Sequence, residues 1–294
     1  MYKVSLHLLA LWSWSNFVFA QIETSLIAQR QTFIQYEEAK FIVKVRNISN
    51  ESLLLTNNSS RKTSWLSFRV KSVNHNTTII KNRELAVGAL RIPPSQSKEV
   101  EINISPYYAI HETGQYTIQA VVELPGRGAY ITDPLVFNVG KGSVMWSAKR
   151  LDEGTEKHYS LIRFLERDRA YLYIRVEEPK VNVVHATKRL GTIVSYTDPQ
   201  IAFDPDLTLH VLHTVGATTY RYTMIDVDGA ILYQEDRMIT RTVPKMAKTP
   251  QGLVRLVGGG KVGGEEDVEL LSSGQRITGL NQDDEDIPMA LPVN

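Results

Sequence analysis

Apolar residues at alternate positions are the feature that most constrains this fold. Between residues 22 and 140 they recur with period two in short runs, and turn-rich segments separate the runs. Side chains alternate between the two faces of a β-strand, so each run predicts a strand with one buried face. The pattern therefore predicts an antiparallel sandwich, and no helical periodicity competes with it. The runs are 41–45, 66–70, 100–104, 116–122 and 135–139.

Two motifs give this first half a resemblance to an immunoglobulin-type sandwich. Residues 112–116, ETGQY, have the E-x-G-x-Y spacing of the tyrosine corner, in which a Tyr hydroxyl bonds to upstream backbone. Trp65 opens a central strand pattern, where its ring is expected to fill the core. Residues 41–49 are also similar to the V-x-V-x-N-x-S opening of exported bacterial Ig-like modules. The resemblance implies a fold and no activity, because such sandwiches host many functions.

The second half, residues 144–262, is predicted to be antiparallel β as well. Residues 159–165 and 170–176 read as a hairpin around the turn at 166–169. The alternative is a helix over 159–167, but 171–176 is strongly strand-like. Further strands are expected at 181–186, 192–196, 207–213, 219–226, 230–235, 237–243 and 253–257.

An internal repeat with an offset of 45 residues runs through the end of this half. Residues 198–212 align without a gap on 243–257, so that Pro199 meets Pro244 and Pro205 meets Pro250. A period of 40–50 residues with about four strands is typical of a β-propeller blade. The segment from Leu209 to Leu232 resembles the blades of exported bacterial propellers, with an Asp-Gly turn between strands.

Residues 144–262 hold fewer than three such repeats, whereas closed propellers have about four to eight blades. The repeat is therefore incomplete, and a ring cannot close. Open sheet edges need cover, because unpaired backbone groups invite pairing with another chain. We expect the first half, or a second copy of the chain, to provide it.

The N-terminal segment predicts a signal peptide, and the C-terminal segment predicts a disordered tail. Residues 1–20 combine Lys3, an apolar run and Val18-Phe19-Ala20, which is the layout of a secretory signal peptide cleaved before Gln21. The alternative, an uncleaved anchor, is disfavoured because the run is short and includes His7 and Asn16. Residues 263–294 alternate acidic clusters with Ser, Gly and Gln, and are expected to form a disordered acidic tail. The protein is thus expected to be exported: periplasmic, on the cell surface or secreted.

Composition narrows the class of protein. The chain has 294 residues and no cysteine, so it has no disulfide framework, thiol nucleophile or thiolate metal site. A cysteine-free exported chain of this size favours a bacterial source. Six Asn-x-Ser/Thr sequons, all in the first half, argue the other way unless they are only turn residues. The formal net charge of +1 gives no electrostatic reason to expect nucleic acid or an anionic membrane as a partner.

No motif for catalysis or for a cofactor emerges. His210 and His213 lie three apart on a predicted strand and should face opposite ways, one inside and one outside, which argues against a metal site with His185. Residues 226–229, DVDG, fit a hairpin turn better than a calcium loop. The glycine-rich stretch 258–264 lacks the Gly-Lys-Ser/Thr of a phosphate loop and reads as a flexible exit from the last strand.

The remaining candidate site is a stripe of tyrosines on predicted strands. Tyr171, Tyr173, Tyr220 and Tyr222, with Tyr233 nearby, would line a sugar- or peptide-binding face if they were exposed together. The alternative is that these rings are half-buried packing.

Together these features favour a non-enzymatic binding or structural module of the cell envelope or surface, without a cofactor. An envelope or surface protein, or a glycan, would be its partner, with a second copy joining through an open sheet edge. The alternative is a carbohydrate-active hydrolase or lyase, or an accessory subunit of one, with its site between the two β domains.

Overall fold

The computed structural model describes residues 21–57, 63–79, 83–124, 128–194, 197–262, 269–270 and 276–277. The expected signal peptide, residues 1–20, lies outside the described residues. So does most of the expected tail, of which only β23 (Glu269–Leu270) and β24 (Arg276–Ile277) are described, as an antiparallel pair. The described chain is all β, and none of it forms a helix that could cross a membrane.

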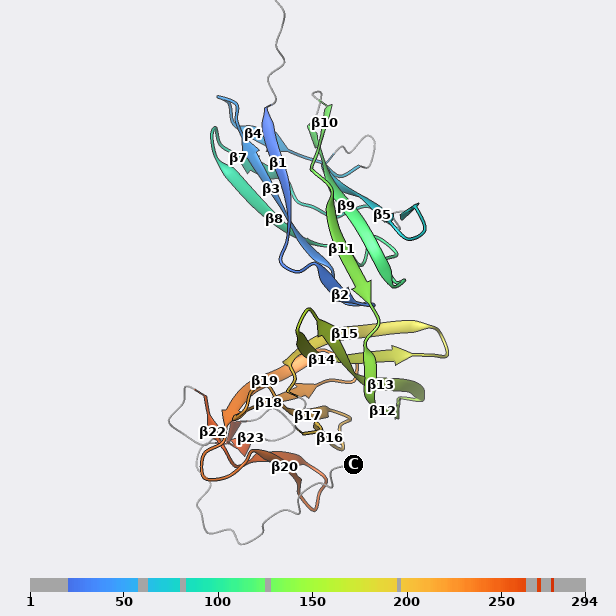
Figure 1. Ribbon diagram of the computed structural model, residues 1–294, viewed down its shortest axis with the longest axis vertical. Coiled ribbons are helices and arrows are strands. Elements are labelled where there is room, and N and C mark those ends of the chain that lie inside the picture. The colour runs from blue at the N-terminus through green and yellow to red at the C-terminus, as the bar shows by residue number, and fades with distance from the viewer. Residues whose placement is uncertain are drawn as a thin grey trace, which may run out of the picture.

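Two sheets face each other in the first half and enclose one apolar core (Figure 1). The first has the strand order β1-β3-β8, and the second has the order β2-β11-β9-β5-β6 with β10 also on β9. A short pair, β4-β7, lies beside them. The strands are β1 Ile22–Ala28, β2 Thr32–Ile34, β3 Lys40–Asn47, β4 Leu53–Leu55, β5 Leu66–Ser72, β6 Thr77–Ile79, β7 Leu90–Ile92, β8 Ser97–Asn103, β9 Gly114–Leu124, β10 Gly128–Ile131 and β11 Leu135–Gly140.

The alternating residues of the first half face inward as the period-two pattern predicts. In β3, Phe41, Val43 and Val45 are fully buried, and β5 and β9 repeat this alternation. The Trp65 ring is buried in the core, and its Nε1 donates to the carbonyl of Gly88 at 2.8 Å. The backbone contact expected of a tyrosine corner is present, since the Tyr116 hydroxyl donates to the carbonyl of Glu112 at 2.8 Å.

The second half consists, among the described residues, of four antiparallel sheets in a propeller-like arrangement. This exceeds the expected number of fewer than three repeats, because two of the sheets have only two strands each. Their orders are β12-β13-β14-β15, β16-β17-β18-β19-β22, β20-β21 and β23-β24. The strands are β12 Ser143–Asp152, β13 Thr155–Glu166, β14 Arg169–Glu178, β15 Val183–Thr192, β16 Gln200–Phe203, β17 Leu209–Thr214, β18 Thr219–Ile225, β19 Ile231–Met238, β20 Lys245–Lys248, β21 Val254–Val257 and β22 Gly260–Lys261.

The 45-residue repeat is confirmed at the level of strand register. Strand β20 begins and ends 45 residues after β16, and each backbone pair of β16-β17 recurs 45 residues later in β20-β21. Ile201 pairs with Val211, for example, and Met246 pairs with Leu256. The connecting turn repeats too, because Leu207 and Gly252 both have positive φ, 62° and 85°.

Some strand boundaries differ from the expected ones. Residues 237–243 were expected as a separate strand, but β19 continues to Met238 and the chain from 239 to 244 is a loop. Part of the expected strand 192–196 is the end of β15. Strand β12 had no clear alternating signal, because it lies at a sheet edge and most of its residues are exposed, with only Trp146, Ala148 and Asp152 partly buried. The glycine-rich stretch after β21 was expected to be a flexible exit, yet Gly260–Lys261 pairs with β19.

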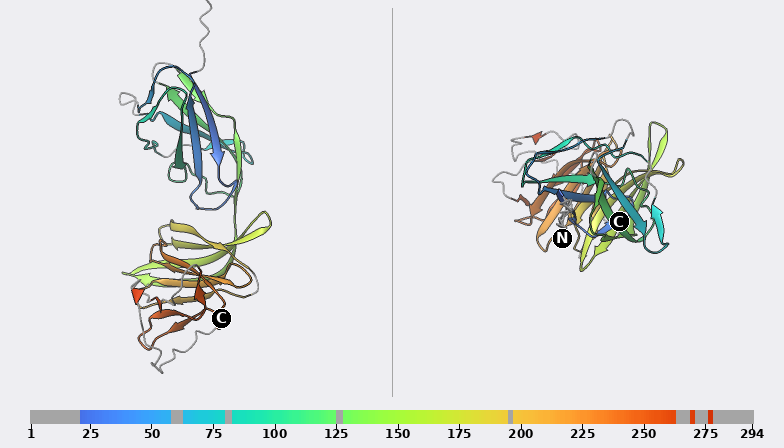
Figure 2. Two further views of the ribbon diagram at one scale, coloured as in Figure 1. Left: turned by 90° about the vertical axis from the view of Figure 1, so that its left-hand side faces the viewer. Right: turned by 90° about the horizontal axis from the view of Figure 1, so that it is seen from above.

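The sheets of the second half stack face to face, and the β12-β15 sheet lies nearest the first half (Figure 2). One face of β13-β14 carries Tyr159, Leu161 and Ile174 into a core shared with β16-β18. The other face carries Ile162, Phe164 and Tyr173, which pack on Ile34 of the first half. The first half therefore covers a face of the β12-β15 sheet, rather than one of its edges.

Candidate binding site

The four candidate tyrosines lie on two separate faces, and the structure does not bring them together. Tyr171 and Tyr173, on β14, point toward the first half, whereas Tyr220 and Tyr222, on β18, pack in the cluster that includes Met246 of β20. Tyr173 and Tyr222 are fully buried. The structure thus offers no single exposed stripe of these four rings, because neighbouring sheets cover both β14 and β18.

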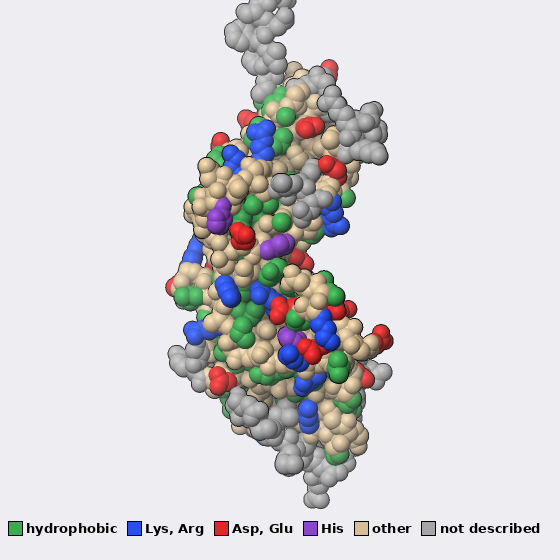
Figure 3. Space-filling model, turned by 90° about the vertical axis from the view of Figure 1, so that its right-hand side faces the viewer, with side chains coloured by type: hydrophobic (Ala, Val, Ile, Leu, Met, Phe, Trp, Pro, Cys, Tyr) green, Lys and Arg blue, Asp and Glu red, His purple; other side chains and the backbone are tan. Residues whose placement is uncertain are grey.

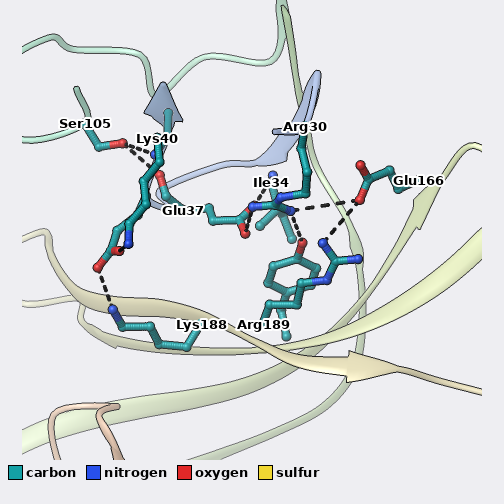
Figure 4. Close-up of polar contacts among 11 residues, drawn as sticks. Arg30, Ile34, Glu37, Lys40, Ser105, Glu166, Lys188 and Arg189 are labelled. Carbon is teal, nitrogen blue, oxygen red and sulfur yellow. Dashed lines mark hydrogen bonds and ion pairs between the residues drawn. The ribbon is translucent and has the colours of Figure 1, made fainter. Parts of the chain in front are cut away.

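The Tyr173 hydroxyl lies at the junction between the two halves and accepts a hydrogen bond at 3.1 Å from Nη1 of Arg30, which lies in the loop after β1. Figure 4 shows the guanidinium of Arg30 between Glu37 and Glu166. The other terminal nitrogen of Arg30 donates to Glu37, and the second oxygen of Glu37 accepts the Ile34 amide at 3.1 Å. Burial disfavours the charge of Arg30, but the hydrogen bond and charge of Glu37 outweigh it and raise the pKa of Arg30. This arginine is therefore a permanently charged, hydrogen-bonded link.

A second set of contacts crosses the junction beside the first. Arg175 of β14 donates from Nη2 to the carbonyl of Gln35 at 2.7 Å, and its guanidinium lies 5.0 Å from the centroid of the Tyr36 ring. Lys188 of β15 donates to Glu38 at 2.6 Å. The segment from Arg30 to Glu38, which includes β2, thus contacts both β14 and β15, and these contacts fix the two halves relative to each other.

A cavity of about 490 Å³ opens beside this junction. One wall is the loop after β1 with Asn138 of β11, and the other is the turn between β13 and β14. The cavity therefore takes residues from both halves. The lining residues are Ala28, Gln29, Arg30, Gln31, Thr32, Asn138, Glu166, Arg167, Asp168, Arg169 and Tyr171.

The charges around the cavity fall into a paired and an unpaired group. Glu166 lies between Arg30 and Arg189, with oxygen-to-nitrogen distances of 3.9 and 3.5 Å, and the guanidinium of Arg189 stacks 3.4 Å from the centroid of the Tyr171 ring. In contrast, the exposed side chains of Arg167, Asp168 and Arg169 form no ion pair with the described residues. Figure 3 shows basic and acidic side chains gathered on the second half close to the junction.

His210 and His213 do not converge on one metal ion, because strand β17 directs them to opposite faces. Strand β17 places His210 on the face of Leu212 and His213 on the face of Val211, so the expectation of opposite faces is confirmed. The expectation that one of them is outside is wrong, because sheets cover both faces of β17 and bury both rings. His210 bonds to the Tyr222 hydroxyl at 2.6 Å and to Asp204 at 3.3 Å. Among the described residues, no group of three His, Asp or Glu side chains could hold a metal ion.

The DVDG segment forms the predicted turn between β18 and β19. Oδ1 of Asp226 accepts the backbone amides of Asp228 and Ala230, at 3.0 and 2.7 Å, and so closes the loop on itself. Asp228 pairs with Lys157 of β13 at 2.7 Å. This turn therefore connects two neighbouring sheets.

No protein-family model matches this chain, and no curated protein matches it. The candidate site therefore rests on geometry. Sequence reasoning singled out Tyr171 and Tyr173 but missed Arg30, Glu37 and Arg189, because these residues belong to no motif and meet only in the folded chain.

Proposed function

We propose that this protein is an exported, non-enzymatic binding or structural module of the cell envelope or surface. The observation that carries the proposal is the junction itself, where Arg30, Tyr173 and Arg175 link the two β halves beside a polar cavity. Preformed concave sites with a few convergent polar groups are the usual form of ligand sites, and they occur preferentially between domains.

Two further parts of the proposal concern the first half and the leader. We assign the first half to the Ig-like sandwiches, supported by its two facing sheets and by the bond from Tyr116 to Glu112. Export is supported by the signal-peptide layout of residues 1–20. Sequencing the N-terminus of the secreted or periplasmic protein tests the leader, since cleavage leaves Gln21 first.

A retention assay tests the binding function. The immobilised full chain is incubated with a panel of glycans and envelope proteins, beside an unrelated cysteine-free β protein as a control. We expect specific retention of at least one component. Loss of retention in the Arg30→Ala variant, with the protein still folded, would place binding at the junction. A panel that yields no retention would overturn the proposal.

The alternative function is a carbohydrate-active hydrolase or lyase, or an accessory subunit of one. The observation that favours it is the position of Glu166 and Asp168, which both line the cavity between the halves. Release of reducing ends or unsaturated products from polysaccharides, lost in the Asp168→Asn variant, would support this function over simple binding.

A second copy of the chain would join through the open edge at β12. This strand pairs only with β13 among the described strands and exposes Val144, Met145 and Leu151. Light scattering across a concentration series tests this pairing. We expect a mass that rises with concentration and a Met145→Lys variant that stays monomeric.

A further inference from the structure

The unpaired charges at the junction cavity point to a specific kind of ligand. Arg167 is the first residue of the two-residue turn between β13 and β14, and Arg169 follows the turn, where it pairs with Glu166 across the two strands. Both guanidinium groups are exposed at the cavity, and neither forms an ion pair with the described residues. Guanidinium groups bind carboxylates through two parallel hydrogen bonds, so these two side chains have the chemistry to hold a carboxylate.

The backbone conformation of Arg167 is a second observation that bears on the role of its side chain. Its φ is 56°, at the first position of a two-residue hairpin turn, where glycine is the favoured residue. A side chain in this left-handed region costs about 1–2 kcal/mol. Arg167 makes no hydrogen bond or ion pair within the described chain that would offset that cost. A ligand contact would give the Arg167 side chain a role that no contact within the described chain supplies.

The rest of the lining argues against a simple polyanion. Asp168 would repel a doubly charged phosphate group more strongly than a single carboxylate, and its own carboxylate accepts hydrogen bonds from hydroxyl groups. Gln31, Thr32 and Asn138 supply further uncharged donors and acceptors, and the ring of Tyr171 adds an apolar surface. A ligand with one carboxylate and several hydroxyl groups matches all of these groups at once.

We propose that the junction cavity binds an acidic oligosaccharide, with the carboxylate of a uronic acid held by Arg167 and Arg169. This proposal rests on the binding function proposed above and names its ligand class. The volume of about 490 Å³ lies within the range of small-molecule sites, roughly 300–1,000 Å³. Because the lining comes from both halves, the site exists only when the junction is formed.

Calorimetric titration of the full chain tests the proposal, with a short oligogalacturonate as the probe and its uncharged galactose counterpart as the comparison. We expect the acidic sugar to bind at least about tenfold more tightly than the neutral one. The double variant R167A/R169A should lose about tenfold or more of that affinity. The control R69A/R91A removes the same charge from exposed positions away from the cavity and should bind as the wild type does.

The variant Arg167→Gly separates binding from folding. Glycine removes the guanidinium and relieves the positive φ, so the variant should be at least as stable as the wild type and still bind the acidic sugar more weakly. Equal affinity in wild type and R167A/R169A overturns the uronate site. If the panel retains another ligand, unaffected by these variants, the binding function stands and this ligand class falls. If nothing at all is retained, the binding function itself fails.

Discussion

The hydroxyl of Tyr173 accepts a hydrogen bond from Nη1 of Arg30 at 3.1 Å, across the junction and 143 residues away in the chain. The acceptor ring is fully buried and packs on Phe164, so the bond lies in a medium of low dielectric constant. Burial, reinforced by the charge of Glu37, raises the pKa of Tyr173, so its hydroxyl remains protonated at neutral pH. A bond to a charged donor in such a place contributes more than one at the surface.

Replacing Tyr173 by phenylalanine should therefore destabilise the protein. The change keeps the ring but leaves Arg30 with one fewer acceptor, and we expect a loss of about 1.5–3 kcal/mol in the free energy of unfolding. Urea denaturation measures it. Tyr171→Phe is the matched control, because the Tyr171 ring lies on the same strand and its hydroxyl makes no hydrogen bond to a described residue. Equal stability of the two variants would contradict the importance of the Arg30 bond.

The other contacts at the junction should contribute different amounts to the free energy of unfolding, measured by the same urea denaturation. Arg175→Met removes the bond to the Gln35 carbonyl and the contact with the Tyr36 ring, and should cost about 2 kcal/mol. Glu38→Gln removes the ion pair with Lys188. The side chain of Glu38 is 43% exposed and that of Lys188 is 37% exposed. An exposed pair contributes about 0–1 kcal/mol, so this variant should lie close to the wild type. A larger loss of stability in Glu38→Gln than in Arg175→Met would show that charge, and not burial, holds the halves together.

The Asp-Gly turn that docks on the neighbouring sheet gives a third prediction. A Cβ at Gly229 would lie 2.6 Å from the Cβ of Ala186 and 3.0 Å from Val176, and the residue has φ of +88°. Gly229→Ala should therefore cost about 3 kcal/mol, combining backbone strain with overpacking. Thermal or chemical unfolding measures the loss.

Two other glycines separate these causes. Gly154 has nearly the same φ, +85°, with nothing within 4 Å of its added Cβ, so Gly154→Ala should show the strain alone, about 1 kcal/mol. Gly88 has neither a left-handed φ nor a neighbour within 4 Å, and its Ala variant should be neutral. If Gly229→Ala lost no more stability than Gly154→Ala, the turn would be able to move away from Ala186 and Val176 without a loss of free energy.

Strand positions and turns that recur along the chain could be predicted from the sequence. The burial that results from packing between sheets could not. The offset of 45 residues predicted the matching strand pairs that begin at Gln200 and Lys245, because alternation and turn residues recur together. The burial of His213 was not predictable, since alternation describes one strand and says nothing of a second covering sheet. The junction was not predictable either, because Arg30 and Tyr173 share no local pattern.

Burial of His213 predicts how stability changes with pH. The ring is buried, and burial, aided by the charge of Arg221, lowers the pKa of His213 to about 4. The unfolded chain, with a histidine pKa of about 6.5, binds the extra proton first. Stability from this residue is therefore fully present above pH 6.5 and is lost as pH falls from about 6.5 toward 4.

Between pH 7 and pH 5 this residue should remove about 2 kcal/mol from the free energy of unfolding. His210, whose pKa burial also lowers, acts in the same direction, so the wild type alone does not isolate His213. The variant His213→Gln removes its titration while leaving His210 in place. Its stability relative to the wild type should therefore improve by that amount as pH falls from 7 to 5, measured by urea denaturation at each pH. A constant difference across this range would mean that the His213 ring takes up its proton without unfolding, and that the space between β17 and β15 is open to water.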